Sequence, residues 1–231
     1  MPIRRATSDD LPAIAELCVA AFYDDELYGD LMHPLREKFP SDFEAFWIRR
    51  IRESWYDWNH VWCVATTQEQ GKEVVVGAAD WDMMGTVGDK YRLNNWDPRH
   101  AILPFIRAFH NLNTTIHPNR AANPNPKLAN PLHDAFPFFA HHWSGARANS
   151  VYLELLGIHP QYQGRGFAKE LLEWGMDKAR EEGVSTSLTS SMKGNMFYRK
   201  MGYTTEVGKC TEGEGNPVAS LDSGWILFID P

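Results

Sequence analysis

The segment from Val151 to Arg180 constrains the fold of this chain more than any other part of the sequence. An extended apolar run ends at Ile158, and Pro160 closes it because proline cannot donate a hydrogen bond to a sheet ladder. From Phe167 onward the apolar residues recur with the period of an α-helix. The loop over residues 161–166 is therefore predicted to join a strand to the N-terminus of a helix.

This junction is suited to bind a diphosphate. The first N–H groups of a helix have no partner within the helix, and the helix dipole favours negative charge at the same end. Gly164 and Gly166 let a ligand approach the backbone, while Arg165 and Lys169 add positive charge. General nucleotide motifs fit poorly, because Lys169 stands where a dinucleotide fingerprint has its third glycine and no Gly-Lys-Ser/Thr triplet is present.

The strand, loop and helix resemble motif A of the GNAT superfamily of acyl-CoA-dependent N-acetyltransferases. Gln161, Gly164 and Gly166 match its pattern Gln/Arg-x-x-Gly-x-Gly/Ala. The alternative is an ordinary strand-to-helix turn. The resemblance implies that acetyl-CoA binds as a co-substrate, with its pantetheine amides near the strand backbone and its diphosphate on the loop. The implied binding residues are Leu156, Ile158, Gln161, Gln163, Gly164, Arg165, Gly166, Ala168 and Asn195.

A second element, Asn195 to Tyr203, also resembles the superfamily. It follows a predicted strand from Val184 to Leu188, and Gly202 suits the left-handed residue that ends a short helix. The resemblance implies that Tyr198 faces the thioester sulfur and that Asn195 contacts the pantetheine or phosphate arm. Alternatively, Tyr198 is a packed aromatic residue and Asn195 a helix N-cap.

Acetyl transfer to an amine requires removal of a proton from the ammonium group and protonation of the departing thiolate. Glu154, on the motif A strand, is the first candidate base. Strict alternation places it opposite Leu153 and Leu155, whereas a bulge, which the family generally has, would change its direction. A salt-bridged or solvated carboxylate is the alternative. Tyr198 is the candidate general acid, because a phenol with a pKa near ~10 stays protonated at neutral pH.

Size and composition fit one domain, residues 1–231, with an aromatic-rich core. The net charge of −7 argues against a general nucleic-acid binder and favours cationic substrates such as amines. Without a long apolar run or a signal-peptide core, and with three scattered cysteines, the chain is expected to be cytoplasmic and not membrane-bound.

An insertion at about residues 84–149, before the motif A strand, departs from the superfamily pattern. Residues 99–112 are predicted to be helical and residues 114–131 irregular. We expect the insertion to wall the acceptor pocket or to form a homodimer interface, so that deletion of residues 114–131 should alter acceptor affinity or oligomeric state. His133, His141 and His142 lack a persuasive ligand set, and adjacent histidines should diverge, so no metal is expected.

The resemblance implies an α/β GNAT fold, with a central mixed, mostly antiparallel sheet splayed in the middle and helices on both faces. It also implies an acetyl-CoA-dependent N-acetyltransferase that moves the acetyl group directly to an amine, which we expect to belong to a small molecule. The alternatives are a protein or peptide N-acetyltransferase and a non-catalytic acyl-CoA-binding protein.

Overall fold

The computed structural model describes residues 3–91, 99–128 and 130–231. The described residues form a seven-stranded sheet with the order β1-β2-β3-β4-β5-β7-β6, in which only β4 and β5 pair in parallel. The predicted mixed, mostly antiparallel sheet is confirmed. The strands are β1 (Ile3–Arg5), β2 (His60–Glu69), β3 (Lys72–Met83), β4 (Ser150–Ile158), β5 (Ser185–Ser190), β6 (Thr205–Lys209) and β7 (Trp225–Ile229).

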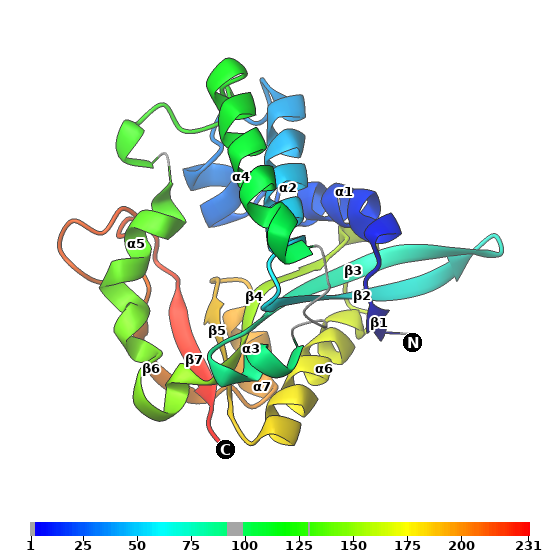
Figure 1. Cartoon of the computed structure of the whole chain (residues 1–231), viewed down its shortest axis with the longest axis vertical. Coiled ribbons are helices and arrows are strands. Elements are labelled where there is room, and N and C mark those ends of the chain that lie inside the picture. Colours follow the sequence, from blue (N-terminus) through cyan, green and yellow to red (C-terminus); the bar gives the residue numbers. More distant parts are fainter. Residues whose placement is uncertain (1–2, 92–98, 129) are drawn as a thin grey trace.

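Helices cover both faces of this sheet (Figure 1). On one side α1 and α2 pack on the strands, α4 lies outside α2, and α6 covers the opposite side. A short π-helical turn spans Glu26–Leu31. The helices are α1 (Leu11–Ala21), α2 (Pro40–Trp55), α3 (Thr86–Tyr91), α4 (Arg99–Ile116), α5 (Pro131–Phe139), α6 (Phe167–Glu182) and α7 (Asn195–Lys200).

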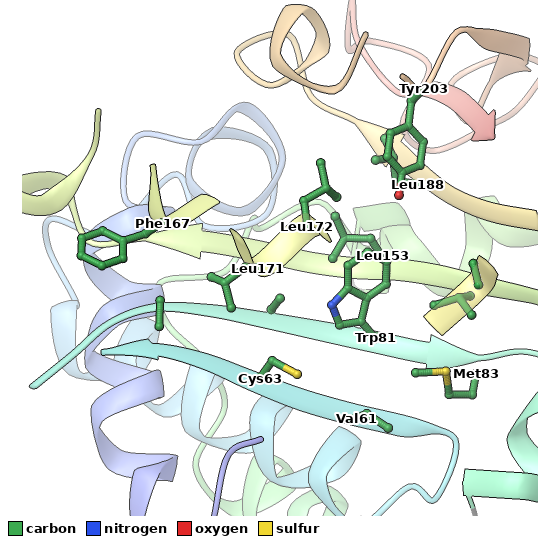
Figure 2. Packing of buried hydrophobic residues seen from close by; sticks show 14 of the residues in the cluster. Val61, Cys63, Trp81, Met83, Leu153, Phe167, Leu171, Leu172, Leu188 and Tyr203 are labelled. Carbon is green, nitrogen blue, oxygen red and sulfur yellow. The ribbon is translucent and has the colours of Figure 1, made fainter. Parts of the chain in front are cut away.

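Two apolar cores result, one on each face. Figure 2 shows the core on the α6 side, where Trp81 of β3 lies among Leu153 of β4 and the α6 residues Leu171 and Leu172. The other core joins α1 and α2 to the opposite face of the same strands. Because both faces of β3 and β4 are buried, the positions of these two strands are firmly fixed by packing.

A β-bulge interrupts the pairing of β3 with β4. Asp80 pairs with Leu155 and Trp81 with Leu153, so Glu154 has no partner in the ladder. Leu153 consequently belongs to the core on the α6 side and Leu155 to the core on the α1 and α2 side. The bulge expected from the resemblance is present, and simple alternation does not hold at Glu154.

The sheet is splayed immediately beyond this bulge. β4 pairs with β5 only from Ser150 to Leu153, although β4 continues to Ile158. The edge of β4 that faces β5 is therefore unpaired over its last residues, where its backbone groups can pair with a ligand.

The insertion contains α3, α4 and α5; residues 92–98 and 129 lie outside the described part of the chain. The predicted helix at 99–112 is confirmed and continues to Ile116. The segment after it is irregular, as expected, apart from a 3₁₀ turn at Pro126–Leu128. Arg120 ties this segment to α2 through a two-pronged ion pair with Asp42.

Gly175 of α6 is required for the packing of Trp81. A Cβ at Gly175 would overlap the Trp81 ring, which is fully buried. Gly175→Ala should therefore lower the free energy of unfolding by about 1–3 kcal/mol, although alanine is the better helix former by about 1 kcal/mol. Urea unfolding measures the change. In the double variant with Trp81→Phe the cost of Gly175→Ala should shrink, and additive effects would contradict the contact.

Candidate active site

A cavity of about 530 Å³ opens where β4 and β5 separate. Its walls come from the bulged part of β4 (Tyr152 to Leu156), the end of β5, the Glu26–Leu31 turn, α5, and the loop that precedes β7. The insertion thus contributes a wall through α5, from Leu132 onward. The described residues of the stretch 114–131, whose deletion was expected to alter acceptor affinity or oligomeric state, do not line this cavity.

Glu154 projects into the cavity from the bulge and is held by Arg50 of α2. The Arg50 guanidinium lies 2.5 Å from Glu154 Oε1 and also 5.4 Å from the centre of the Tyr28 ring. Glu154 is therefore both salt-bridged and part of the cavity lining. Arg50 was not singled out in the sequence, because only the packing of α2 across the bulge brings it there.

Asp82 of β3 is a second cavity carboxylate, which sequence reasoning missed. Burial raises its pKa from 3.8 to about 6; the Glu154 charge raises it further, while His60 opposes the rise. Its carboxylate makes no hydrogen bond within the described part of the chain. The available signal was alternation in β3, which places Asp80 and Asp82 on the face opposite Trp81.

His60 beside Asp82 is a fixed positive charge. Its ring Nδ1 lies 2.9 Å from Asp80 Oδ1. Burial alone would lower the pKa of His60, but the Asp80 carboxylate outweighs burial and raises it to about 10. His60 and Asp80 therefore form an ion pair at neutral pH, which leaves Asp82 as the carboxylate available to a ligand.

Tyr198 of α7 lines the cavity. Its ring packs against Phe197 and Tyr203, and its hydroxyl makes no hydrogen bond to any described residue. Burial raises its pKa further above that of a free phenol, so the group stays protonated. A Cβ at Gly194 would lie 2.7 Å from the Tyr198 ring, so glycine at this position makes room for the tyrosine.

Asn195 does not cap α7, since the N-cap is Gly194. Its Oδ1 accepts a hydrogen bond from Arg199 Nε at 2.8 Å, while its Nδ2 is buried without a partner. Asn195 lies outside the cavity lining. A buried amide donor with no acceptor is costly, and an oxygen of a bound ligand would satisfy it.

The glycine loop has the open geometry that a diphosphate requires. Gly164 and Gly166 have φ of 74° and 90°, and a Cβ at Gly164 would meet nothing within 4 Å. The first hydrogen bond of α6 runs from the Glu170 N–H to the Gly166 carbonyl at 3.3 Å, which leaves the preceding N–H groups, including that of Ala168, free. Arg165 donates to the Gln161 carbonyl at 3.0 Å.

The loop and the cavity are connected by the unpaired edge of β4. Gln163 Nε2 donates to the Ile158 carbonyl at 3.2 Å, which anchors the loop to the strand end, and Leu156 lines the cavity. From Glu154 to Ile158 this edge spans about 13 Å. The site therefore suits a ligand with a diphosphate at one end, a reactive group at the other and an extended arm between them.

Histidines provide no evident metal site. Among residues 3–91, 99–128 and 130–231, no group of three His, Cys, Asp or Glu side chains is placed to hold a metal ion. His141 and His142 do not diverge as expected. Their ring centroids are 4.0 Å apart, because Ala140–His142 forms a tight 3₁₀ turn.

The comparison with protein families supports an acyltransferase as the class of this protein. The sequence model of the acetyltransferase (GNAT) domain matches residues 137–205. The resemblance to the GNAT superfamily seen in the sequence is confirmed. None of the curated proteins matches it. Within the described segments, no helix is both long and apolar enough to cross a membrane.

Solved structures share the fold at low sequence identity. An acetyltransferase from Corynebacterium glutamicum, described as histone acetyltransferase HPA2 and related acetyltransferase, is 19% identical with a TM-score of 0.59, over 99% of this chain and 95% of that one. The PaiA N-acetyltransferase of Thermoplasma acidophilum, in complex with coenzyme A, is 12% identical with a TM-score of 0.52, over 100% and 98%. An N-acetyltransferase from Staphylococcus aureus Mu50 is 17% identical with a TM-score of 0.51, over 99% and 98%.

Proposed function

We propose that this chain is an acetyl-CoA-dependent N-acetyltransferase whose acceptor is a small-molecule amine. The observation that carries the proposal is the unpaired edge of β4, which runs from the glycine loop to a cavity holding Glu154, Asp82 and Tyr198. A thioester supplies an acyl group that is already activated, so the protein has to position two reactants and move protons.

The loop and the strand edge account for donor binding. The free N–H groups around Gly166 and Ala168 would receive the diphosphate, assisted by the helix dipole and by Arg165. The backbone at Leu156 and Ile158 would pair with the amides of the arm, and the unsatisfied Asn195 Nδ2 would donate to an oxygen of the same ligand. The coenzyme A bound to the Thermoplasma relative supports this reading.

Glu154, Asp82 and Tyr198 account for the proton transfers. A carboxylate, Glu154 or Asp82, takes a proton from the ammonium group and exposes the nitrogen lone pair. The nitrogen then bonds to the thioester carbonyl carbon as the carbon–sulfur bond breaks. Tyr198 donates its proton to the departing sulfur and is reprotonated by the second proton that leaves the nitrogen, so the products are an amide and the free thiol.

Release of free thiol from acetyl-CoA, followed against a panel of amines and short peptides, tests the proposal. Amine-dependent release with formation of the acetylated amine is the expected result. Small amines should exceed peptides, because a cavity of about 530 Å³ has the size of a small-molecule site. Acetyl-CoA binding without transfer to any acceptor would favour the non-catalytic alternative. Faster turnover of peptides would favour the protein N-acetyltransferase alternative.

The donor site can be tested separately through Gly164. Gly164→Ala should raise the KM for acetyl-CoA about tenfold or more, because a side chain strains a residue with φ of 74° and crowds the backbone that the diphosphate approaches. Gly183→Ala is the matched control: its φ is 64°, and its Cβ would also meet nothing within 4 Å, but it lies at the other end of α6. Equal KM values in the two variants would contradict the assignment.

A further inference from the structure

We infer that the acceptor is a monoamine with an apolar, preferably aromatic, body, and that this body lies along a row of four aromatic rings in the cavity. The inference rests on the proposed function and extends it to the substrate class. The row, here called the aromatic ladder, consists of Phe136, Phe139, Trp143 and Tyr152, and all four residues line the cavity.

The ladder runs without interruption from the surface to the reacting groups. Successive ring centroids are 5.6 Å apart for Phe136–Phe139, 6.1 Å for Phe139–Trp143 and 5.4 Å for Trp143–Tyr152, all edge to face. Phe136 at the outer end is 51% exposed. Tyr152 at the inner end is the direct partner of Asp82 in the pairing of β3 with β4.

The polar atoms of the ladder are already engaged within the protein. Trp143 Nε1 donates to Ser187 Oγ at 3.0 Å, and the Tyr152 hydroxyl donates to Thr189 Oγ1 at 3.3 Å. The ladder therefore presents hydrocarbon to the cavity. A polar body lying along it would lose its water without gaining hydrogen bonds, which disfavours sugars and peptides.

Charge at the inner end selects a cation. Asp25, Glu26, Asp82 and Glu154 line the cavity together with Arg50. The Arg50 cation pairs with the Glu154 carboxylate, which leaves the lining acidic. Asp25 accepts from the Leu27 and Tyr28 N–H groups and Glu26 accepts from the Met192 N–H.

Asp82 is therefore the cavity carboxylate left for one ammonium group. A second positive charge on the acceptor would lie against the aromatic and aliphatic wall. No carboxylate there would offset the free-energy cost of removing this charge from water. A monoamine is the class that satisfies both the single carboxylate and the apolar ladder.

The test measures kcat/KM at saturating acetyl-CoA for 2-phenylethylamine, pentylamine, 1,5-diaminopentane and ethylamine. We expect 2-phenylethylamine to exceed ethylamine by about 100-fold, and pentylamine to exceed the equally long diamine by about tenfold or more. Phe139→Ala should lower the value for 2-phenylethylamine at least about tenfold and that for ethylamine less than about threefold. Phe139→Leu keeps an apolar side chain at this position, so that folding is preserved. It should lower kcat/KM for 2-phenylethylamine less than Phe139→Ala does, and still more than it lowers kcat/KM for ethylamine.

Phe105→Ala is the matched control, because Phe105 of α4 is 75% exposed and does not line the cavity. Calorimetric titration of each amine into the protein with coenzyme A tests the inferred acceptor class separately from the proposed acetyltransferase function. Binding of 2-phenylethylamine that depends on Phe139, without transfer, would support the ladder and contradict the proposed function. The inference would be overturned if acetyl transfer showed no preference for apolar monoamines, or if the preference were unchanged in both Phe139 variants. It would also be overturned if no amine bound at all.

Discussion

Replacement of Asp82 by asparagine is expected to lower kcat/KM for the amine by about 10²- to 10⁴-fold. Asp82 has the features of a general base: it lines the cavity, it has no hydrogen-bond partner among the described residues, and its pKa is raised by burial to about 6. At neutral pH it is ionised and still basic enough to accept a proton. Steady-state kinetics between pH 5 and pH 8 measures the effect.

The pH profile distinguishes Asp82 from Glu154. If Asp82 is the base, kcat/KM should rise with pH and level off above about 6, and this limb should disappear in Asp82→Asn. Glu154→Gln is the matched control on the opposite strand. If the rise of kcat/KM with pH remained in Asp82→Asn and disappeared in Glu154→Gln, the base would be Glu154 instead.

The same substitution should stabilise the fold at neutral pH. The pKa of Asp82 is about 6 in the folded chain against an ordinary value of 3.8, so folding favours the protonated carboxyl. The contribution of the protonated carboxyl to the free energy of unfolding is complete below pH ~4 and is lost as pH rises through about 6. Asparagine stays neutral, so the unfolding free energy of Asp82→Asn relative to the wild type should grow by on the order of 2 kcal/mol between pH 4.5 and 7.5. Urea unfolding at both pH values measures this difference, and a difference independent of pH would contradict it.

Tyr198→Phe is expected to lower kcat by about 10²-fold while the KM for acetyl-CoA changes little. The Tyr198 hydroxyl has no hydrogen-bond partner among the described residues, and its raised pKa keeps the proton available through the whole assay range. The ring packing is preserved by phenylalanine, so the loss should fall on the chemical step. Single-turnover measurement of acetyl transfer checks this directly.

Tyr203→Phe is the matched control for that experiment. Tyr203 is fully buried, and its hydroxyl lies 2.8 Å from Thr186 Oγ1, away from the cavity lining. Its loss should cost about 1 kcal/mol of stability without lowering kcat. Equal kcat values for wild type and Tyr198→Phe would remove Tyr198 from the mechanism.

Elements formed by consecutive residues were predicted correctly from the sequence. The strand that ends at Ile158, the glycine loop and the helix from Phe167 follow local rules: hydrophobic period, proline at a strand end and glycines with positive φ. The helix from Asn195 to Lys200 was expected from the resemblance to the superfamily, with Gly202 suited to end it. The donor half of the candidate site lies almost entirely in these elements.

The acceptor half was decided by contacts between distant residues. The bulge at Glu154 depends on the register with β3, and Arg50 reaches Glu154 from a helix 104 residues earlier in the chain. The sequence alone does not distinguish Asp82 from other aspartates in strands. The register of β3 with β4 places it beside Tyr152. No local pattern carries such information, because strand register and helix packing are set by the burial of whole faces.

The insertion shows the same division. Its sequence predicted the helix at 99–112 and an irregular segment after it, but it did not reveal which part of the insertion lines the cavity, namely α5. Trp143, in the segment that follows α5, contacts Phe228 of β7 and lines the same cavity. The sequence by itself thus determined the strand, loop and helix that would hold acetyl-CoA, since their geometry arises within one short segment. Only the tertiary structure decided which carboxylates and aromatic rings meet at the cavity, since those meetings depend on how separate segments pack.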